Sequence, residues 1–305
     1  MTHDDPQIIS KPKDRRVLTG FPPLDEGLGG AGPGDLWLHG GFVGHYKTTF
    51  ALNCAYNQAQ MGERVLFLSL DVSEVQVRRR LLVMHSAHPK FRAERVRLGL
   101  QGEDGPDVGL SYGALRRGEL GREAMALFVD AVVPDWDDPA AKGRVIVESG
   151  FVLADNLQYW ADNTEKESPY SMLFVDSLHL LGTGRNFSSS EERYDETIRT
   201  LKRTAMELGG GGKPVMATFQ VGLEALRQVE ERHNRTGVAR FDLRQLGPSH
   251  VATVADIVTT SYTCEVYADQ KLVLLGNEKS RDTAVVPPFF ARLDSAYRMT
   301  TVPHG

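Results

Sequence analysis

Short apolar runs alternate with amphipathic stretches along the first two thirds of the chain. The apolar runs occupy residues 35–39, 64–70, 144–148, 172–176 and 214–219. Stretches with helical spacing cover residues 48–61, 73–85, 152–162 and 193–208. Continuous apolar runs of this length are typical of strands that are buried on both faces, as in a parallel sheet. The pattern therefore predicts an α/β core.

The last third of the chain has a different pattern. Residues 256–262, 271–275 and 288–293 are predicted strands joined by hairpin-like turns, with no helical stretch between them. The predicted fold class is α/β, a mainly parallel twisted sheet with helices on both faces and an antiparallel C-terminal edge. No internal repeat is visible.

Three stretches lack a clear pattern. Residues 1–16 are polar and are expected to form a flexible N-terminal arm. Residues 87–141 are polar with several Gly and Pro, although 115–129 is expected to contain a helix. Residues 227–245 have no strong periodicity but are rich in arginine, with Arg227, Arg232, Arg235, Arg240 and Arg244.

Composition narrows the class of protein. The 305 residues are enough for one large domain or two of ordinary size, and the net charge of −5 excludes a generally basic surface. Any nucleic-acid contact must therefore come from a local cluster of Lys and Arg. Cys54 and Cys264 lie in apolar surroundings without metal-binding spacing, which is typical of reduced cysteines in a cytoplasmic protein. The N-terminus has no apolar signal region and no run is long enough to span a membrane, so no membrane partner is expected.

The strongest candidate chemistry lies at residues 40–50, GGFVGHYKTTF. A strand, a glycine loop and then Lys-Thr at the start of a helix is the order of a P-loop, in which backbone N–H groups hold phosphate oxygens. Lys47 would reach the terminal phosphates and Thr48 a Mg²⁺ ion. The match departs from G-x-x-x-x-G-K-[ST], because Tyr46 stands where the second glycine is expected. The alternative is a glycine-rich turn that only joins a strand to a helix.

Three polar residues follow other predicted strands, at the edge where open α/β sheets bind ligands. Asp176 fits an acid that holds the Mg²⁺ shell, or a helix-capping Asp. Asp71 is placed to orient or deprotonate the attacking water, or to cap the next helix. Gln220 is a candidate sensor of the γ-phosphate, or a structural residue.

Taken together, these segments resemble the C-terminal ATPase domain of DnaB-type replicative helicases, within the RecA-like group. The resemblance runs from about Val17 to Val302 and rests on TGFPPLDEGLGGAGPGDL, GGFVGHYKTTFALN, VLFLSLDVSEVQVRRRLL, MLFVDSLHLL, LKRTAMELGGGGKPVMATFQ, FDLRQLG, VADIV and LGNEKSRD, in that order. It implies one ATPase domain over residues 17–305, with 87–141 as a family-variable insertion. It also implies a hexameric ring that uses ATP and Mg²⁺ to move along single-stranded DNA in DNA replication, with a replication or recombination partner.

The resemblance assigns roles to individual residues. Asp176 matches the Walker B acid, Gln220 the sensor glutamine, and Asp71 the position of the catalytic base. Lys279 and Arg281 match a Lys-x-Arg pair that reaches the γ-phosphate of a neighbouring subunit. The nucleotide would contact Gly41, Gly44, His45, Tyr46, Lys47, Thr48, Thr49 and Arg80. The residues expected to contact DNA are Arg185, Arg232, Arg235 and Arg240, although ion pairs with Glu230, Glu231 and Asp242 are the alternative for those in 227–245.

Departures from the family leave a second reading open. A left-handed backbone at Tyr46 would cost about 1–2 kcal/mol. Asp71 stands where the family has glutamate, which is one methylene longer. The family's N-terminal collar domain is not expected in this chain. The alternative is therefore a RecA-like assembly or accessory protein that binds nucleotide and hydrolyses it weakly.

Overall fold

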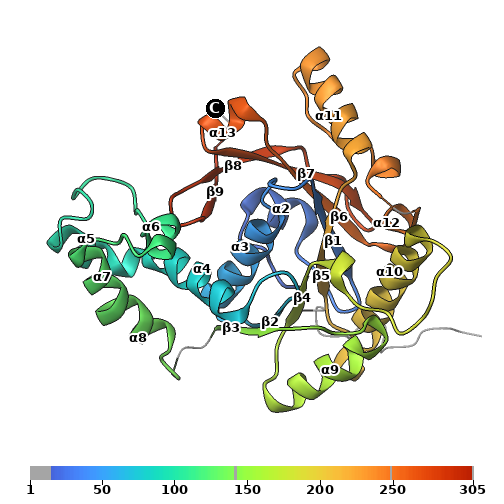
Figure 1. The fold of residues 1–305 in the computed structure, drawn as a ribbon, viewed down its shortest axis with the longest axis horizontal. Coiled ribbons are helices and arrows are strands. Elements are labelled where there is room, and N and C mark those ends of the chain that lie inside the picture. The colour runs from blue at the N-terminus through green and yellow to red at the C-terminus, as the bar shows by residue number, and fades with distance from the viewer. Residues whose placement is uncertain (1–14, 141–142, 248, 304–305) are drawn as a thin grey trace, which may run out of the picture.

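The computed structural model describes residues 15–140, 143–247 and 249–303, so most of the predicted N-terminal arm, residues 1–16, lies outside the described residues. The described part contains one nine-stranded sheet with the order β3-β2-β4-β5-β1-β6-β7-β8-β9 (Figure 1). Its strands are β1 Leu36–Gly41, β2 Arg64–Ser69, β3 Arg144–Ser149, β4 Met172–Asp176, β5 Val215–Gln220, β6 Ile257–Tyr262, β7 Leu272–Ser280, β8 Phe289–Leu293 and β9 Met299–Thr301.

Helices connect and cover the strands. They are α2 Pro22–Leu28, α3 Lys47–Gln60, α4 Glu74–Ser86, α5 Arg92–Arg97, α6 Tyr112–Arg117, α7 Arg122–Leu127, α8 Val133–Trp136, α9 Ala154–Glu167, α10 Ser190–Glu207, α11 Leu223–Thr236, α12 Ser249–Val254 and α13 Glu265–Asp269. Shorter 3₁₀ or π segments are η1 Pro89–Phe91, η2 Phe128–Val132, η3 Leu178–Leu180, η4 Leu208–Gly210 and η5 Leu243–Gln245. None of the helices in the described ranges is long and apolar enough to cross a bilayer.

The predicted fold class is confirmed. Strands β3, β2, β4, β5, β1 and β6 pair in parallel, and β7, β8 and β9 extend the sheet antiparallel to one another. All carboxyl ends of the parallel strands therefore lie at one edge of the sheet, where ligands bind in open α/β folds.

Side chains on the two faces of the sheet alternate, which explains why the central strands are largely apolar. Leu36 and Leu38 of β1 pack into one core with α9 and α10, while Trp37 between them packs into the other core with α3 and α4. Figure 1 shows α3 and α4 on the opposite side of the strands from α9 and α10. Because successive residues of a strand point to opposite faces, burial on both faces requires an unbroken apolar run.

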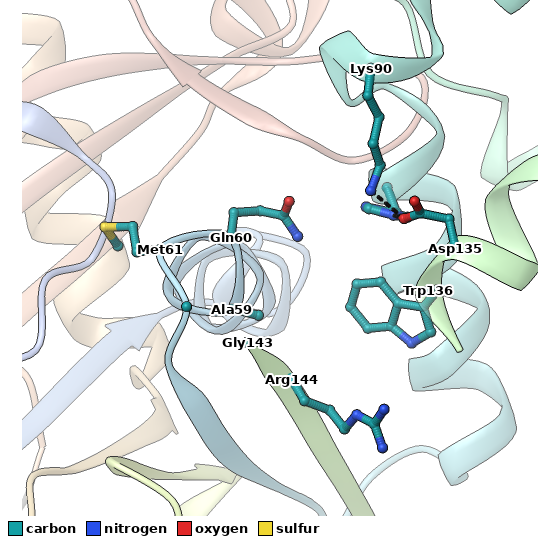
Figure 2. A pocket seen from close by; sticks show the side chains of 10 residues that line it. Ala59, Gln60, Met61, Lys90, Asp135, Trp136, Gly143 and Arg144 are labelled. Carbon is teal, nitrogen blue, oxygen red and sulfur yellow. Dashed lines mark hydrogen bonds and ion pairs between the residues drawn. The ribbon is translucent and has the colours of Figure 1, made fainter. Parts of the chain in front are cut away.

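Residues 87–140 form a third, smaller core with the end of α4, at the left of Figure 1. Its last helix, α8, docks on α3 and α4 through Trp136, which stacks on Tyr56 at 6.2 Å between ring centroids. Beside this contact, Asp135 accepts from His85 Nε2 at 2.8 Å and from Lys90. Figure 2 shows Lys90, Asp135 and Trp136 beside a hollow of about 320 Å³ at the end of α3. Asp135 is already paired with His85 and Lys90, and the hollow lies where the docked segment meets α3.

Several expectations about elements were wrong. The arginine-rich stretch 227–245 begins inside a helix, α11, which ends at the left-handed Gly237. The predicted hairpin turn after residue 262 contains α13, and β9 was not predicted. The strand expected at 271–275 continues to Ser280, so Lys279 lies within β7. Helix α10 begins at Ser190, three residues before the predicted start, because Ser189 caps it by accepting from the N–H of Glu192.

Candidate functional site

The glycine loop joins β1 to α3 at the carboxyl edge of the sheet. Gly44 has φ +81°, which favours glycine, and a Cβ on Gly41 would lie 2.8 Å from Ser261 Oγ. Tyr46, the N-cap of α3, has φ +62° and is therefore left-handed, the conformation that the sequence marked as costly for tyrosine. The loop thus has the two features of a phosphate cradle, a tight turn and a close backbone approach.

Lys47 is the first residue of α3 and curls back over the loop. Its Nζ donates to the carbonyl of Phe42 at 2.9 Å. Burial lowers the pKa of Lys47, and the carboxylates of Asp176 and Asp71 act in the opposite direction. A partly buried ammonium held by a single carbonyl can turn to bind phosphate oxygens at little cost in lost contacts.

Asp176 ends β4 and contacts the first turn of α3. Its Oδ1 accepts from Thr48 Oγ1 at 3.2 Å and from Thr218 Oγ1 at 2.5 Å. Its Oδ2 is buried and has no partner among the described residues. Burial raises the pKa of Asp176, while the hydrogen bonds from Thr218 and Thr48 lower it. An orphaned carboxylate oxygen beside a threonine hydroxyl fits Mg²⁺, which takes oxygen ligands and uses few from the protein.

The other predicted strand ends surround the same edge. Gln220 is paired in register with Gly41, the residue that opens the loop. Asp71 is exposed and follows Leu70, whose N–H donates to the carbonyl of Asp176 at 2.7 Å. Arg80 of α4 lies over the ring of Tyr112 at 5.6 Å, and its charge lowers the pKa of Asp176. The structure therefore brings these three side chains to the side of the sheet that carries Lys47.

His179, just past β4, was not singled out from the sequence. Its Nδ1 lies 2.5 Å from Ser177 Oγ. Burial and then the charge of Lys47 lower the pKa of His179, whereas Asp71 and Asp176 raise it. A polar residue three positions beyond a strand-end acid is a weak signal, and only the fold places this imidazole beside the phosphate loop.

Lys279 and Arg281 lie at the opposite end of the sheet from their own phosphate loop. The backbone N–H of Arg281 donates to the carbonyl of Asp256 at 2.9 Å, and the N–H of Asp256 donates to the carbonyl of Leu36 at 2.9 Å. The Arg281 guanidinium also pairs with the Asp256 carboxylate, and Lys279 donates to the carbonyl of Ala255. Leu36 begins β1, whose five steps to Gly41 span roughly 17 Å.

The arginines expected to contact DNA fall into two places. Arg185 pairs with Asp155 at 3.5 Å and with Glu196 at 3.7 Å. The hollow beside it, about 510 Å³, is lined by Arg185, Phe187, Ser189, Glu191, Glu192, Asp195, Glu196 and Arg199. Four of these residues carry carboxylates, so the surroundings of Arg185 are acidic.

The second place is α11 and the loop after it. Arg232 donates to the carbonyl of Arg240 at 3.1 Å, while Arg240 pairs with the buried Glu278 at 3.3 Å. Arg235 is exposed on the same helix. The ion-pair partner of Arg240 is thus Glu278, a residue outside the set weighed from the sequence. Arg232, Arg235 and Arg240 form a local group, and Arg185 belongs to another element.

Comparisons with known proteins agree with this geometry. The family model described as DnaB-like helicase C terminal domain matches residues 16–104. The replicative DNA helicase DnaB of Geobacillus stearothermophilus is 28% identical over 254 residues, which are 82% of this chain and 48% of that protein. The chain therefore spans about half the length of the curated relatives it matches.

Two solved structures share the fold at 19% identity. One, titled as the ATPase domain of G40P, has a TM-score of 0.72 and covers 98% of this chain and 95% of its own. The other, titled as a DnaB-like replicative helicase and its interactions with primase, has a TM-score of 0.74 and covers 99% and 69%.

Proposed function

Because this chain is a relative of the DnaB-type replicative helicases and resembles their C-terminal ATPase domain, we propose that it is an ATP-dependent motor that moves along single-stranded DNA. The proposal includes an oligomer, of hexameric ring form, in which ATP and Mg²⁺ bind each phosphate loop. It also includes a replication or recombination partner and a cytoplasmic location.

The observation that carries the proposal is the meeting of β1, β4 and α3. Lys47 and Thr48 of α3 meet the end of β4 there, where the buried Oδ2 of Asp176 has no partner in the part of the chain that the structure describes. An unsatisfied buried carboxylate oxygen costs about 1–3 kcal/mol, so a site that keeps one is expected to gain a ligand for it. Mg²⁺ bound to nucleotide phosphates is a ligand of the required charge and hardness.

In the proposed phosphoryl transfer, each of the chain's own residues has a separate role. Lys47 and the loop N–H groups hold phosphate oxygens, while Thr48 and Asp176 hold the metal. Asp71, exposed at the end of β2, orients the attacking water and accepts its proton, and Gln220 senses the terminal phosphate. When bound, Mg²⁺-ATP supplies the scissile phosphoanhydride bond and the charge that these groups neutralise. Lys279 and Arg281 serve the site of a neighbouring copy.

Specific observations also favour the second candidate, an assembly or accessory protein that hydrolyses ATP weakly. Tyr46 holds a left-handed backbone, and Arg281 is paired with Asp256 of its own chain. Both features work against rapid turnover, since the arginine must leave Asp256 before it can act on another subunit.

One experiment separates the two candidates. Hydrolysis of Mg²⁺-ATP is measured with and without single-stranded DNA, beside a sizing measurement on the same samples. A motor hydrolyses ATP, is stimulated by single-stranded DNA and forms a closed oligomer. Nucleotide binding with slow hydrolysis that DNA does not change would favour the accessory protein. No nucleotide binding at all would refute both.

A further inference from the structure

A row of hydrogen-bonded, buried polar side chains lies beneath the phosphate loop and extends from the middle of the sheet to the loop. His39 of β1 is fully buried, and its Nδ1 lies 2.9 Å from Thr259 Oγ1. Its Nε2 lies 3.2 Å from Ser261 Oγ, and Ser261 donates to the carbonyl of His45 in the loop. At the other end, Trp37 Nε1 donates to Thr259 Oγ1 at 2.8 Å.

The groups at the two ends of this row, the His45 carbonyl and the Trp37 indole, determine where each proton lies. The His45 carbonyl can only accept, so Ser261 spends its one hydroxyl proton there, and His39 must donate to Ser261 from Nε2. The indole of Trp37 can only donate, so Thr259 accepts from it and has its own proton for His39 Nδ1. A neutral imidazole protonated on Nε2 meets both demands, and burial together with the charge of Lys47 lowers the pKa of His39 well below its usual value.

Packing fixes the ring that joins the two hydroxyls. The ring of Phe50, from the second turn of α3, stacks on the His39 imidazole at 4.0 Å between centroids and 19° between planes. Both rings are fully buried. The imidazole therefore has one position and one tautomer, and the Ser261 hydroxyl has one direction.

We propose that His39, Thr259 and Ser261 form a positioning relay that holds the His45 carbonyl and so keeps the phosphate loop ready for nucleotide. The relay rests on the proposed nucleotide site. Its target is the peptide that joins His45 to Tyr46, the residue with the left-handed backbone. Holding that carbonyl from below offsets the preference of tyrosine for other conformations.

The test compares two isosteric substitutions at neighbouring positions of β6. Thr259→Val removes a hydroxyl of the relay, whereas Thr260→Val removes a hydroxyl that donates to Glu278 Oε1 at 2.9 Å and has no part in it. Both threonines are buried, so both variants lose some stability: Thr259→Val loses the hydrogen bonds to Trp37 and His39, and Thr260→Val loses the one to Glu278. Binding of Mg²⁺ with a fluorescent ATP analogue should weaken by up to about tenfold in Thr259→Val and in Ser261→Ala. Thr260→Val should bind like the unsubstituted protein.

A double-mutant cycle with Tyr46→Gly and an NMR spectrum of the His39 ring add two measurements that general destabilisation of the fold would not change. In the Tyr46→Gly background, Ser261→Ala should cost less affinity, because glycine adopts the left-handed conformation freely. Nitrogen-15 spectra should show His39 protonated on Nε2 and not on Nδ1, with the signal assigned by its loss in His39→Gln.

The outcomes separate the relay from the site it serves. If Lys47→Ala weakens binding but Thr259→Val and Ser261→Ala bind normally, the relay is wrong and the nucleotide site stands. Equal losses in Thr259→Val and Thr260→Val, or the opposite His39 tautomer, also overturn the relay. If Lys47→Ala binds nucleotide normally, both proposals fail.

Discussion

At the scale of single residues, the candidate site combines well-placed groups with two departures, at Tyr46 and Asp71, from the DnaB-type pattern that the chain resembles. Lys47, Thr48 and Asp176 lie together, and the strand ends add Asp71 and Gln220. These placements follow from the sequence: Asp71, Asp176 and Gln220 each end or directly follow an apolar run, Lys47 and Thr48 follow the glycine loop after another run, and parallel strands end at one edge. His39 could not be found in this way, since a histidine inside an apolar run gives no signal until its partners on β6 are known.

Replacing Lys47 by Ala should weaken Mg²⁺-ATP binding by roughly 10- to 100-fold, because a charge-assisted hydrogen bond to phosphate contributes about 1.5–3 kcal/mol. Equilibrium binding measures the effect. Lys166→Ala, a change near the end of α9, is the matched control and should bind normally. Equal affinity in the two variants would contradict the assignment of the phosphate loop.

Replacing Asp71 by Glu should raise the rate of hydrolysis if Asp71 is a base held back by its short side chain. The longer side chain moves the carboxylate by about one methylene, and misplacement of this size can cost on the order of 100-fold in rate. Single-turnover hydrolysis is the measurement, with Asp71→Asn as the inactive control. If neither variant changes the rate, the base lies elsewhere, with Glu74 the next candidate.

At the scale of elements, the sequence predicted strands better than the helices that cover them late in the chain. A strand that is buried on both faces needs a largely apolar sequence, so β1, β2, β4 and β5 could be predicted from their apolar runs. Helix α11 was not recognised, because its buried residues are only Ala225, Leu226 and Val229, and the rest of the helix apart from the exposed Leu223 is charged or polar. Elements as short as α13 and β9 carry too few residues for any period to be visible.

The docking of α8 makes stability depend on pH. Burial lowers the pKa of His85 from 6.5 to about 4, against the pull of Asp135, with Lys90 and His88 also lowering it. Between these values the unfolded chain takes up the proton and the folded chain does not, so the free energy of unfolding should fall from pH 6.5 to 4, by up to roughly 3 kcal/mol. Denaturant unfolding across this range should show a shallower dependence in His85→Gln. An unchanged slope would contradict a neutral, buried His85.

Helix α11 and its following loop carry the basic group expected to bind single-stranded DNA. Affinity should fall steeply with salt, by about 0.7 in log–log slope for each neutralised phosphate. Replacing Arg232, Arg235 and Arg240 together by Gln should weaken binding and flatten that slope, measured by fluorescence anisotropy at several salt concentrations. Arg185→Gln tests the surface around Arg185 separately, and a smaller loss of DNA affinity is expected there because carboxylates surround this arginine. Full affinity in the triple variant, or a flat salt dependence, would count against this surface.

At the scale of the whole molecule, the strand order determines how far Arg281 lies from the phosphate loop of its own chain. Strand order could not be read from the sequence, because apolar runs do not reveal their neighbours. Strands β6 and β7 are antiparallel, so Lys279 pairs with Val258 near the start of β6 while the phosphate loop lies beyond its far end. Arg281 therefore lies far from its own phosphate loop, and under the proposed motor its guanidinium would act on the loop of a second copy of the chain.

The most direct test of the motor is a mixing experiment with two inactive variants. Arg281→Ala should bind Mg²⁺-ATP almost normally but lose turnover by roughly 10³- to 10⁵-fold, the contribution of an arginine supplied to a phosphoryl-transfer site. Lys47→Ala should have little turnover, because it binds nucleotide weakly and lacks the positive charge at the phosphates. Mixed oligomers of the two should regain part of the ATPase activity, at interfaces that join an intact loop to an intact arginine. Mixed oligomers that form but stay inactive, or an Arg281→Ala protein that hydrolyses ATP normally, would contradict the shared site.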